Sequence, residues 1–177
     1  GANHNAAFLL CREAFFCVVN PDIEFAGNPF VELVAEIERT HSALAAPLVT
    51  APQGCIEDSI RYFPTLISMA KKLLGVGDGR YLVIPGQASF FPEWVAGMFM
   101  VFRSQSFLEL GGFDEGYFLY YEDVDICVRI WKSGLKLLAC PRVAVIHDAR
   151  RDSHRSMRHL RWHLLSMGRY FARYAGR

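Results

Sequence analysis

Two continuous apolar runs are the strongest signals along the chain, and both are typical of strands buried on two faces of a sheet. The first is Ala-Phe-Phe-Cys-Val-Val at 14–19, and the second is Val-Ala-Gly-Met-Phe-Met-Val-Phe at 95–102. Asn-Pro-Asp at 20–22 ends the first run, because proline cannot continue a central ladder. Three shorter runs predict further strands, at 46–51, 136–139 and 143–146. We expect Pro141 to separate the last two.

Helical patterns lie between these strands. Helices are expected at 3–13, 29–40, 64–74, 104–110 and 121–133, and from Ser153 onward. In the helix after Tyr121, four apolar residues recur at i, i+3, i+4 and i+7 and predict its buried stripe: Val124, Cys127, Val128 and Trp131. Glu122, Asp125 and Arg129 fall on the opposite face, which we expect to be solvated. Alternating strands and helices indicate an α/β fold, and several short connections favour a mixed sheet.

The composition is that of a globular protein, with 52% hydrophobic and 14% aromatic residues. We find neither a signal peptide nor an apolar run of about 18 residues, so export and membrane spanning are not expected. The five cysteines are widely spaced and form no Cys-x-x-Cys pair, which fits a reducing compartment. The sequence therefore favours a cytoplasmic protein.

The charge is unevenly distributed, although the net charge is only +1. Residues 142–177 hold nine arginines against two aspartates, so the C-terminal segment is strongly basic. We divide the chain into a domain at 1–152 and a basic amphipathic helix at 153–177. That helix could pack on the domain with a solvated basic face, or lie on an anionic membrane. Nucleic acid is the least favoured partner, because no base-reading motif accompanies the arginines.

Carboxylates at the start of the helix after Tyr121 are the candidate catalytic groups. Asp123 lies between the two faces in the first turn, where its side chain can project beyond the helix end and act as a general base. Acidic residues also stabilise a helix N-terminus without any catalytic role, and that alone would explain Glu122 and Asp125.

Two strand ends carry candidate metal ligands. Asp22 directly follows the first buried strand, where a hard cation bridging a diphosphate could use its oxygens. An Asx turn capping the strand explains the same residues. His147 ends the 143–146 strand and could complete a metal site with Asp22 or contact a phosphate, although a lone histidine there is more often structural.

These motifs, in this order, resemble the family 2 inverting glycosyltransferases of the GT-A fold, and within them the bacterial rhamnosyltransferase-like branch. The resemblance rests on Asn-Pro-Asp at 20–22, Ala-Gly-Met-Phe-Met at 96–100, Gly-Gly-Phe-Asp-Glu at 111–115, Tyr-Glu-Asp-Val-Asp at 121–125, Arg129, Lys-Ser-Gly at 132–134 and Val-Ile-His at 145–147. It covers nearly the whole chain and is strongest from Val95 to His147. It implies a GT-A-like, Rossmann-like mixed sheet flanked by helices, with a long C-terminal helix.

The resemblance also implies roles for single residues. Asp123 matches the family's general base, and Glu122 would help to place the acceptor. Asp22 matches the metal-contacting aspartate of the family's Asp-any-Asp motif, although the first position of that motif is here Asn20. Together with His147, Asp22 would bind Mg²⁺ or Mn²⁺. Donor or acceptor binding is expected for Asn20, Gly97, Asp114 and Arg129, the last lying near the diphosphate or bracing the catalytic helix. The residues after His147, 148–152, depart from the family's glycine-rich stretch.

The implied reaction is inverting transfer of a sugar from a nucleoside-diphosphate donor to a saccharide or lipid-linked acceptor, in cell-envelope polysaccharide synthesis. L-rhamnose is the sugar by analogy with the branch. A lipid-linked acceptor would bring the protein to the inner face of the cell membrane as a peripheral protein.

Other functions remain open at this point. Family members normally begin with a strand–helix–strand–helix segment that holds the nucleotide, and the chain lacks it. The sheet should therefore expose an edge strand that a second copy could cover, as in a homo-oligomer.

The alternative function is a non-catalytic, truncated module at a membrane or in an oligomer. A nucleotidyltransferase is disfavoured, because no glycine-rich phosphate loop with a lysine is present.

Overall fold

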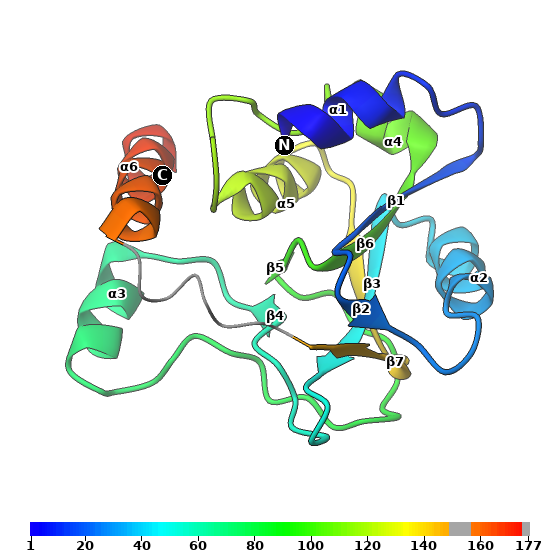
Figure 1. Cartoon of the computed structure of the whole chain (residues 1–177), viewed down its shortest axis with the longest axis horizontal. Coiled ribbons are helices and arrows are strands. Elements are labelled where there is room, and N and C mark those ends of the chain that lie inside the picture. The colour runs from blue at the N-terminus through cyan, green and yellow to red at the C-terminus, as the bar shows by residue number, and fades with distance from the viewer. Residues whose placement is uncertain (149–156, 175–177) are drawn as a thin grey trace.

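The computed structural model describes residues 1–148 and 157–174. Its centre is a five-stranded sheet of order β1-β6-β3-β7-β2 (Figure 1). The strands of this sheet are β1 (Phe15–Val19), β2 (Ile23–Glu24), β3 (Leu44–Thr50), β6 (Phe99–Arg103) and β7 (Leu137–His147). A separate two-stranded sheet pairs β4 (Ile60–Arg61) with β5 (Trp94–Val95).

The main sheet is mixed, as the short connections predict. Strands β3 and β7 are parallel, whereas the β1–β6, β3–β6 and β2–β7 pairs are antiparallel. Strands β1, β3 and β7 therefore run in the same direction and end at the same edge of the sheet. Strand β1 has a partner on one side only among the described residues, so the expected edge strand is present.

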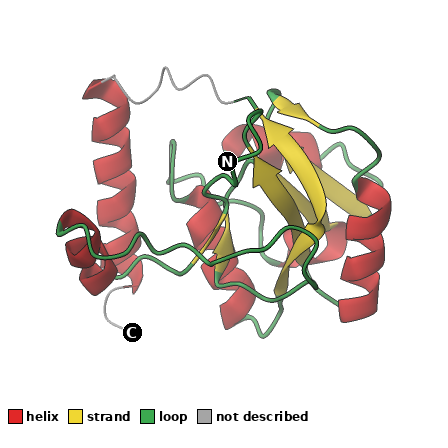
Figure 2. Ribbon diagram, turned by 90° about the horizontal axis from the view of Figure 1, so that it is seen from below, coloured by secondary structure: helices red, strands yellow, loops and turns green. Residues whose placement is uncertain are grey.

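Helices cover both faces of this sheet (Figures 1 and 2). The covering helices are α1 (Ala2–Phe8), α2 (Phe30–Thr40), α4 (Ser104–Glu109) and α5 (Glu122–Lys132). Two further helices, α3 (Leu66–Leu73) and α6 (Met157–Tyr174), lie away from this sheet. Alternation along β6 divides the core between the faces: Phe99 and Val101 pack with α2, while Met100 and Phe102 pack with α4 and α5. None of the helices in the described ranges is long and apolar enough to cross a bilayer.

The strand containing Pro141 differs from the sequence expectation. Proline does not split it, because β7 is continuous from Leu137 to His147. A shift in register accommodates the proline: Pro47 of β3 pairs with Cys140, and Leu48 already pairs with Ala144. Three residues of β7 thus bulge between two paired segments, and a bulge is one of the few places where a sheet tolerates proline.

The end of the first helix differs from expectation, and the start of the last helix is not described. The first helix ends at Phe8 rather than at residue 13. The last helix is described from Met157, so its expected start at Ser153 and the boundary between 152 and 153 lie outside the described residues. The loop at 149–152 lies outside them as well.

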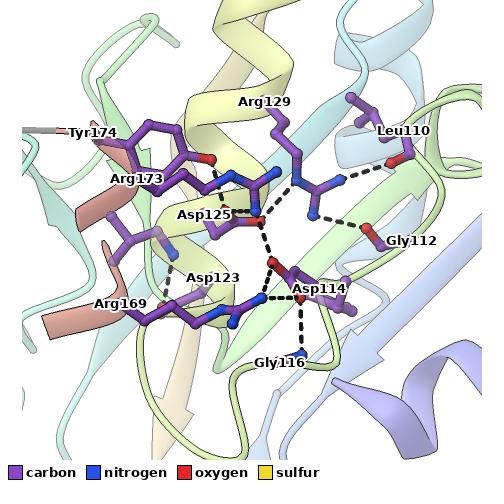
Figure 3. Close-up of polar contacts among 12 residues, drawn as sticks. Leu110, Gly112, Asp114, Gly116, Asp123, Asp125, Arg129, Arg169, Arg173 and Tyr174 are labelled. Atoms are coloured by element: carbon purple, nitrogen blue, oxygen red, sulfur yellow. Dashed lines mark hydrogen bonds and ion pairs between the residues drawn. The ribbon is translucent and has the colours of Figure 1, made fainter. Parts of the chain in front are cut away.

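The polar face of α5 is not solvated, which corrects the expectation for Asp125. Its side chain is fully buried (0% exposed), and Arg129 donates a hydrogen bond from Nε to its Oδ2 at 2.7 Å. The same guanidinium donates to the carbonyl oxygens of Leu110 at 2.7 Å and Gly112 at 2.8 Å (Figure 3). Arg129 therefore fixes α5 to the turn that follows α4.

Helix α6 is bound to the same carboxylate from the other side. Tyr174 donates its hydroxyl to Asp125 Oδ1 at 2.7 Å, and Arg173 donates to the same oxygen at 3.2 Å. Arg169 and Arg173 also pair with Asp114 at 3.1 and 2.7 Å. Asp125 on α5 and Asp114 in the segment before it thus hold the last described helix (Figure 3).

Replacing Arg129 by methionine should destabilise the fold strongly. The substitution leaves the carboxylate of Asp125 buried with part of its charge uncompensated, at a cost of about 3–5 kcal/mol. The measurement is the free energy of unfolding from urea denaturation. The control is Arg39→Met, which removes the exposed i,i+3 pair with Glu36 and should change little. Equal losses in the two variants would contradict a special role for the buried pair.

Candidate active site

A cavity of about 820 Å³ opens beside the end of β1 and the start of β6, and residues directly after β1 and directly before β6 line it. Ligands of open α/β sheets bind outside such carboxyl ends. Asn20 enters the cavity wall directly after β1, and its N–H donates to Met98 O at 2.9 Å. Gly97, just before β6, and the first two residues of α5, Glu122 and Asp123, line the same cavity. The structure thus brings together four of the eight predicted site residues.

Asp123 is fixed in this wall by two backbone hydrogen bonds. Gly97 N donates to its Oδ2 at 3.0 Å, and Val124 N donates to its Oδ1 at 2.8 Å. A Cβ at Gly97 would lie 3.4 Å from the Cβ of Asp123, which is ordinary van der Waals contact. The position of the carboxylate is therefore set by the backbones of two different elements.

The turn before α5 contributes a feature that the sequence did not indicate. Tyr120 and Tyr121 both have a φ of 69°, which is unusual for bulky residues. Such strained backbone persists where the surroundings over-determine it, and it gathers at functional sites. Here α6 supplies the restraint: the ring of Tyr121 lies 5.3 Å from that of Tyr170 and 5.4 Å from that of His163. The hydroxyl of Tyr120 is hydrogen-bonded to His159 Nδ1 at 3.0 Å.

The two adjacent carboxylates are electrostatically perturbed. Burial, and next the nearby charge of Glu122, raise the pKa of Asp123 to about 7 despite the two backbone donors. Burial also raises the pKa of Glu122, whose Oε2 is buried and has no hydrogen-bond partner in the described part of the chain. A carboxylate with a pKa near neutrality can both accept and release a proton in this cavity.

Asp22 and His147 lie together at the same sheet edge but do not line the cavity. Residues 23 and 24 of β2 pair with the end of β7, which brings Asp22 Oδ1 within 3.4 Å of His147 Nε2. Asp22 Oδ1 and His147 Nδ1 are buried and lack hydrogen-bond partners within the described ranges. No group of three or more potential metal ligands occurs among the described residues. The candidate metal ligands at this sheet edge are therefore two, Asp22 and His147.

Asp114 and Arg129 lie away from the cavity wall, in the network that holds α5 and α6. Burial favours the neutral form of Asp114, but the N–H of Gly116 and the guanidinium of Arg169 outweigh it and lower its pKa. For Arg129, the hydrogen bonds described above correspond to the bracing alternative rather than to direct contact with a ligand.

Comparison with known proteins places this site in a family. The chain is 30% identical to the "Rhamnosyltransferase WbbL" of Escherichia coli (strain K12) over 187 aligned residues, which cover 98% of the chain and 70% of that protein. The chain belongs to this family of glycosyltransferases. Residues 87–159, which include Gly97, Glu122, Asp123 and His147, also match the family described as the N-terminal domain of galactosyltransferase.

A second sequence relative supports this glycosyltransferase assignment, and a solved structure shows the fold. The "N-acetylglucosaminyl-diphospho-decaprenol L-rhamnosyltransferase" of Mycobacterium tuberculosis (strain CDC 1551 / Oshkosh) is 32% identical over 139 residues, covering 73% of the chain and 45% of that protein. The crystal structure of GalNAc-T7 with UDP, GalNAc and Mn²⁺ superposes with a TM-score of 0.62 at 20% identity, over 82% of the chain and 29% of the neighbour. The structural likeness confirms the GT-A fold. The chain spans less than half of the mycobacterial relative's length.

The pKa of Asp123 in this glycosyltransferase can be measured directly. Carbon-detected NMR of the Asp123 carboxyl should give a midpoint near pH 7, above the ordinary range of aspartate. In Glu122→Gln the like charge is lost, so the midpoint should move to lower pH. Asp78, which is exposed and faces the same cavity, serves as the internal comparison. An Asp123 midpoint that stays unchanged in Glu122→Gln would contradict the coupling.

Proposed function

We propose that the protein is an inverting glycosyltransferase that moves a sugar from a nucleoside-diphosphate donor to a saccharide or lipid-linked acceptor. The observation that carries the proposal is the carboxylate of Asp123, held by Gly97 N in the wall of a cavity at the sheet edge. The names of the relatives favour L-rhamnose as the sugar and a lipid-linked, cell-envelope glycan as the context.

In this mechanism Asp123 is the general base. Its carboxylate accepts the proton of the acceptor hydroxyl while that oxygen attacks the anomeric carbon from the face opposite the leaving group. The new C–O bond forms as the bond to the diphosphate breaks, so the configuration inverts and the nucleoside diphosphate departs with the electron pair. Glu122, next to the base in the same wall, orients the acceptor.

Asn20 and Gly97 line the donor side of this cavity in the proposed arrangement. Asp114 and Arg129 act indirectly: Arg129 fixes α5, which carries the base, to the turn after α4, and Asp114 binds the neighbouring helix α6. They are positioning residues in this scheme.

A divalent cation fits the residues at the adjacent strand ends. Asp22 Oδ1 and His147 Nε2 are 3.4 Å apart, and Asp22 Oδ1 is a buried acceptor without a hydrogen bond inside the described ranges. Mg²⁺ sites commonly combine one or two protein ligands with substrate phosphates, so Asp22 and His147 would hold Mg²⁺ or Mn²⁺. The ion would neutralise charge on the departing diphosphate.

We also propose a cytoplasmic, peripheral location at the inner face of the membrane. Helix α6 has no acidic residue and exposes Leu160, Leu164 and Leu165. Arg158 and Arg161 lie on the same exposed surface of α6. Apolar and cationic side chains on one helix face favour the interface of an anionic bilayer. The unpaired edge of β1 would be available to a second copy in a homo-oligomer.

Asp123→Asn in the full-length protein should lower the rate of transfer by about 10²–10⁴-fold, because the general base is lost. Donor binding should stay nearly unchanged. The assay scores nucleoside diphosphate release from a panel of nucleotide sugars with Mg²⁺ or Mn²⁺, and donor affinity is measured by calorimetry. The matched control is Asp78→Asn, in the same cavity, which should retain most activity. Full activity of the Asp123 variant would remove this residue from the mechanism.

Reversing two exposed charges of α6, with Arg158→Glu and Arg161→Glu, should weaken binding to anionic vesicles. We expect a loss of at least about tenfold, since each arginine near an anionic surface contributes about 1 kcal/mol. Sedimentation with phosphatidylglycerol vesicles at low salt measures it. Arg12→Glu with Arg39→Glu is a charge-matched control outside α6. Unchanged sedimentation of the α6 variant would count against membrane contact through this helix.

A further inference from the structure

A second hollow, of about 600 Å³, lies between α3, α5 and α6. Its volume falls within the range of about 300–1,000 Å³ that is typical of small-molecule sites. Nine of its eleven lining residues are aliphatic, aromatic or proline. They include Phe63, Ile67, Val128, Trp131, Phe171 and Tyr174. We call this hollow the apolar groove.

The polar atoms of two aromatic residues in the groove are already bonded to the protein. Trp131 donates its Nε1–H to Glu93 O at 3.0 Å, and Tyr174 donates its hydroxyl to the buried Asp125. Lys132 Nζ lies 4.3 Å from the centre of the Tyr174 ring, and Lys132 and Thr65 are the two polar lining residues. The Trp131 ring and the aliphatic side chains provide hydrocarbon surface without unpaired polar atoms that a ligand would have to satisfy. Such a lining matches a ligand with no hydrogen-bonding groups of its own.

The apolar groove adjoins the cavity that holds Asp123. Pro64 lines both, and α3 and α6 contribute to the walls of both. Figures 1 and 2 show these two helices side by side, away from the main sheet. On the cavity side the same helices present Lys72 and His163, whereas on the groove side they present Ile67 and Phe171. The walls formed by α3 and α6 thus change from polar and cationic on the cavity side to apolar on the groove side.

We propose that the apolar groove binds the hydrocarbon chain of a lipid-diphosphate acceptor. Its sugar enters the cavity toward Asp123, its diphosphate lies near Lys72 and His163, and its chain passes over Pro64. This arrangement rests on the proposed glycosyl transfer and specifies the acceptor for it. Binding of the hydrocarbon chain in the groove would hold the acceptor hydroxyl in a fixed orientation near Asp123. It would do so for a substrate that is otherwise anchored in a bilayer.

The test compares a ligand with a hydrocarbon chain and one without. Farnesyl diphosphate and inorganic pyrophosphate are titrated into the full-length protein, and the two dissociation constants are compared. Farnesyl diphosphate should bind at least about tenfold more tightly, since an apolar chain leaves water for an apolar site. Ile67→Asp should abolish this difference without changing pyrophosphate binding. Ile67 is 71% exposed, so the fold should tolerate the change.

The control is Val31→Asp on α2, a residue that is 70% exposed and far from the groove in sequence and fold. It should preserve the difference between the two ligands, and Ile67→Leu should preserve it too. Equal binding of the two ligands, or an Ile67→Asp variant that keeps the difference, would overturn the proposal. A dimer that dissociates in Ile67→Asp, with no chain-dependent binding, would assign the groove to a second copy of the chain instead.

The transfer assay separates this inference from the reaction itself. Transfer to a short-chain acceptor that persists in Ile67→Asp, together with a raised KM for a long-chain acceptor, would support the groove. Intact chain-dependent binding without transfer to any acceptor would contradict the proposed reaction and leave the lipid site standing.

Discussion

The buried ion pair between Asp125 and Arg129 is the interaction on which the site depends. A carboxylate with 0% exposure would be very costly alone, and it is tolerated because a guanidinium, a tyrosine hydroxyl and a second arginine surround it. Arg129 belongs to α5 and is also bonded to the turn after α4, while Arg173 and Tyr174 both belong to α6. The pair thus acts as the common anchor of three segments, and the end of α5 that carries Glu122 and Asp123 extends from that anchor.

Much of the fold could be predicted from the sequence, because burial on two faces leaves a plain signal. The runs at 14–19 and 95–102 correspond to β1 and to the β5–β6 region, and the 3.6-residue period located α2 and α5 within one or two residues. The continuity of β7 through Pro141 could not be predicted, since it depends on a register shift against β3. A bulge of that kind is a property of two strands together.

The candidate site was predictable to a similar depth. Asn20, Gly97, Glu122 and Asp123 meet in one cavity because all four stand at the carboxyl edge of the sheet or face it. The burial of Asp125 could not be read from α5, whose helical pattern places it opposite the apolar stripe. Its extra partners, Arg173 and Tyr174, lie 48 and 49 residues further along the chain. Local periodicity carries no information about contacts at that separation.

The left-handed turn at Tyr120 and Tyr121 couples the orientation of the carboxylates at the start of α5 to the packing of α6. Its strain is sustained by aromatic contacts with His163 and Tyr170 rather than by the sheet. If warming releases α6 while the five strands are still paired, the turn loses these contacts. The enzyme would then lose its activity below the temperature at which the sheet unfolds. The temperature of inactivation would measure how firmly α6 is bound to the domain, and not the stability of the core.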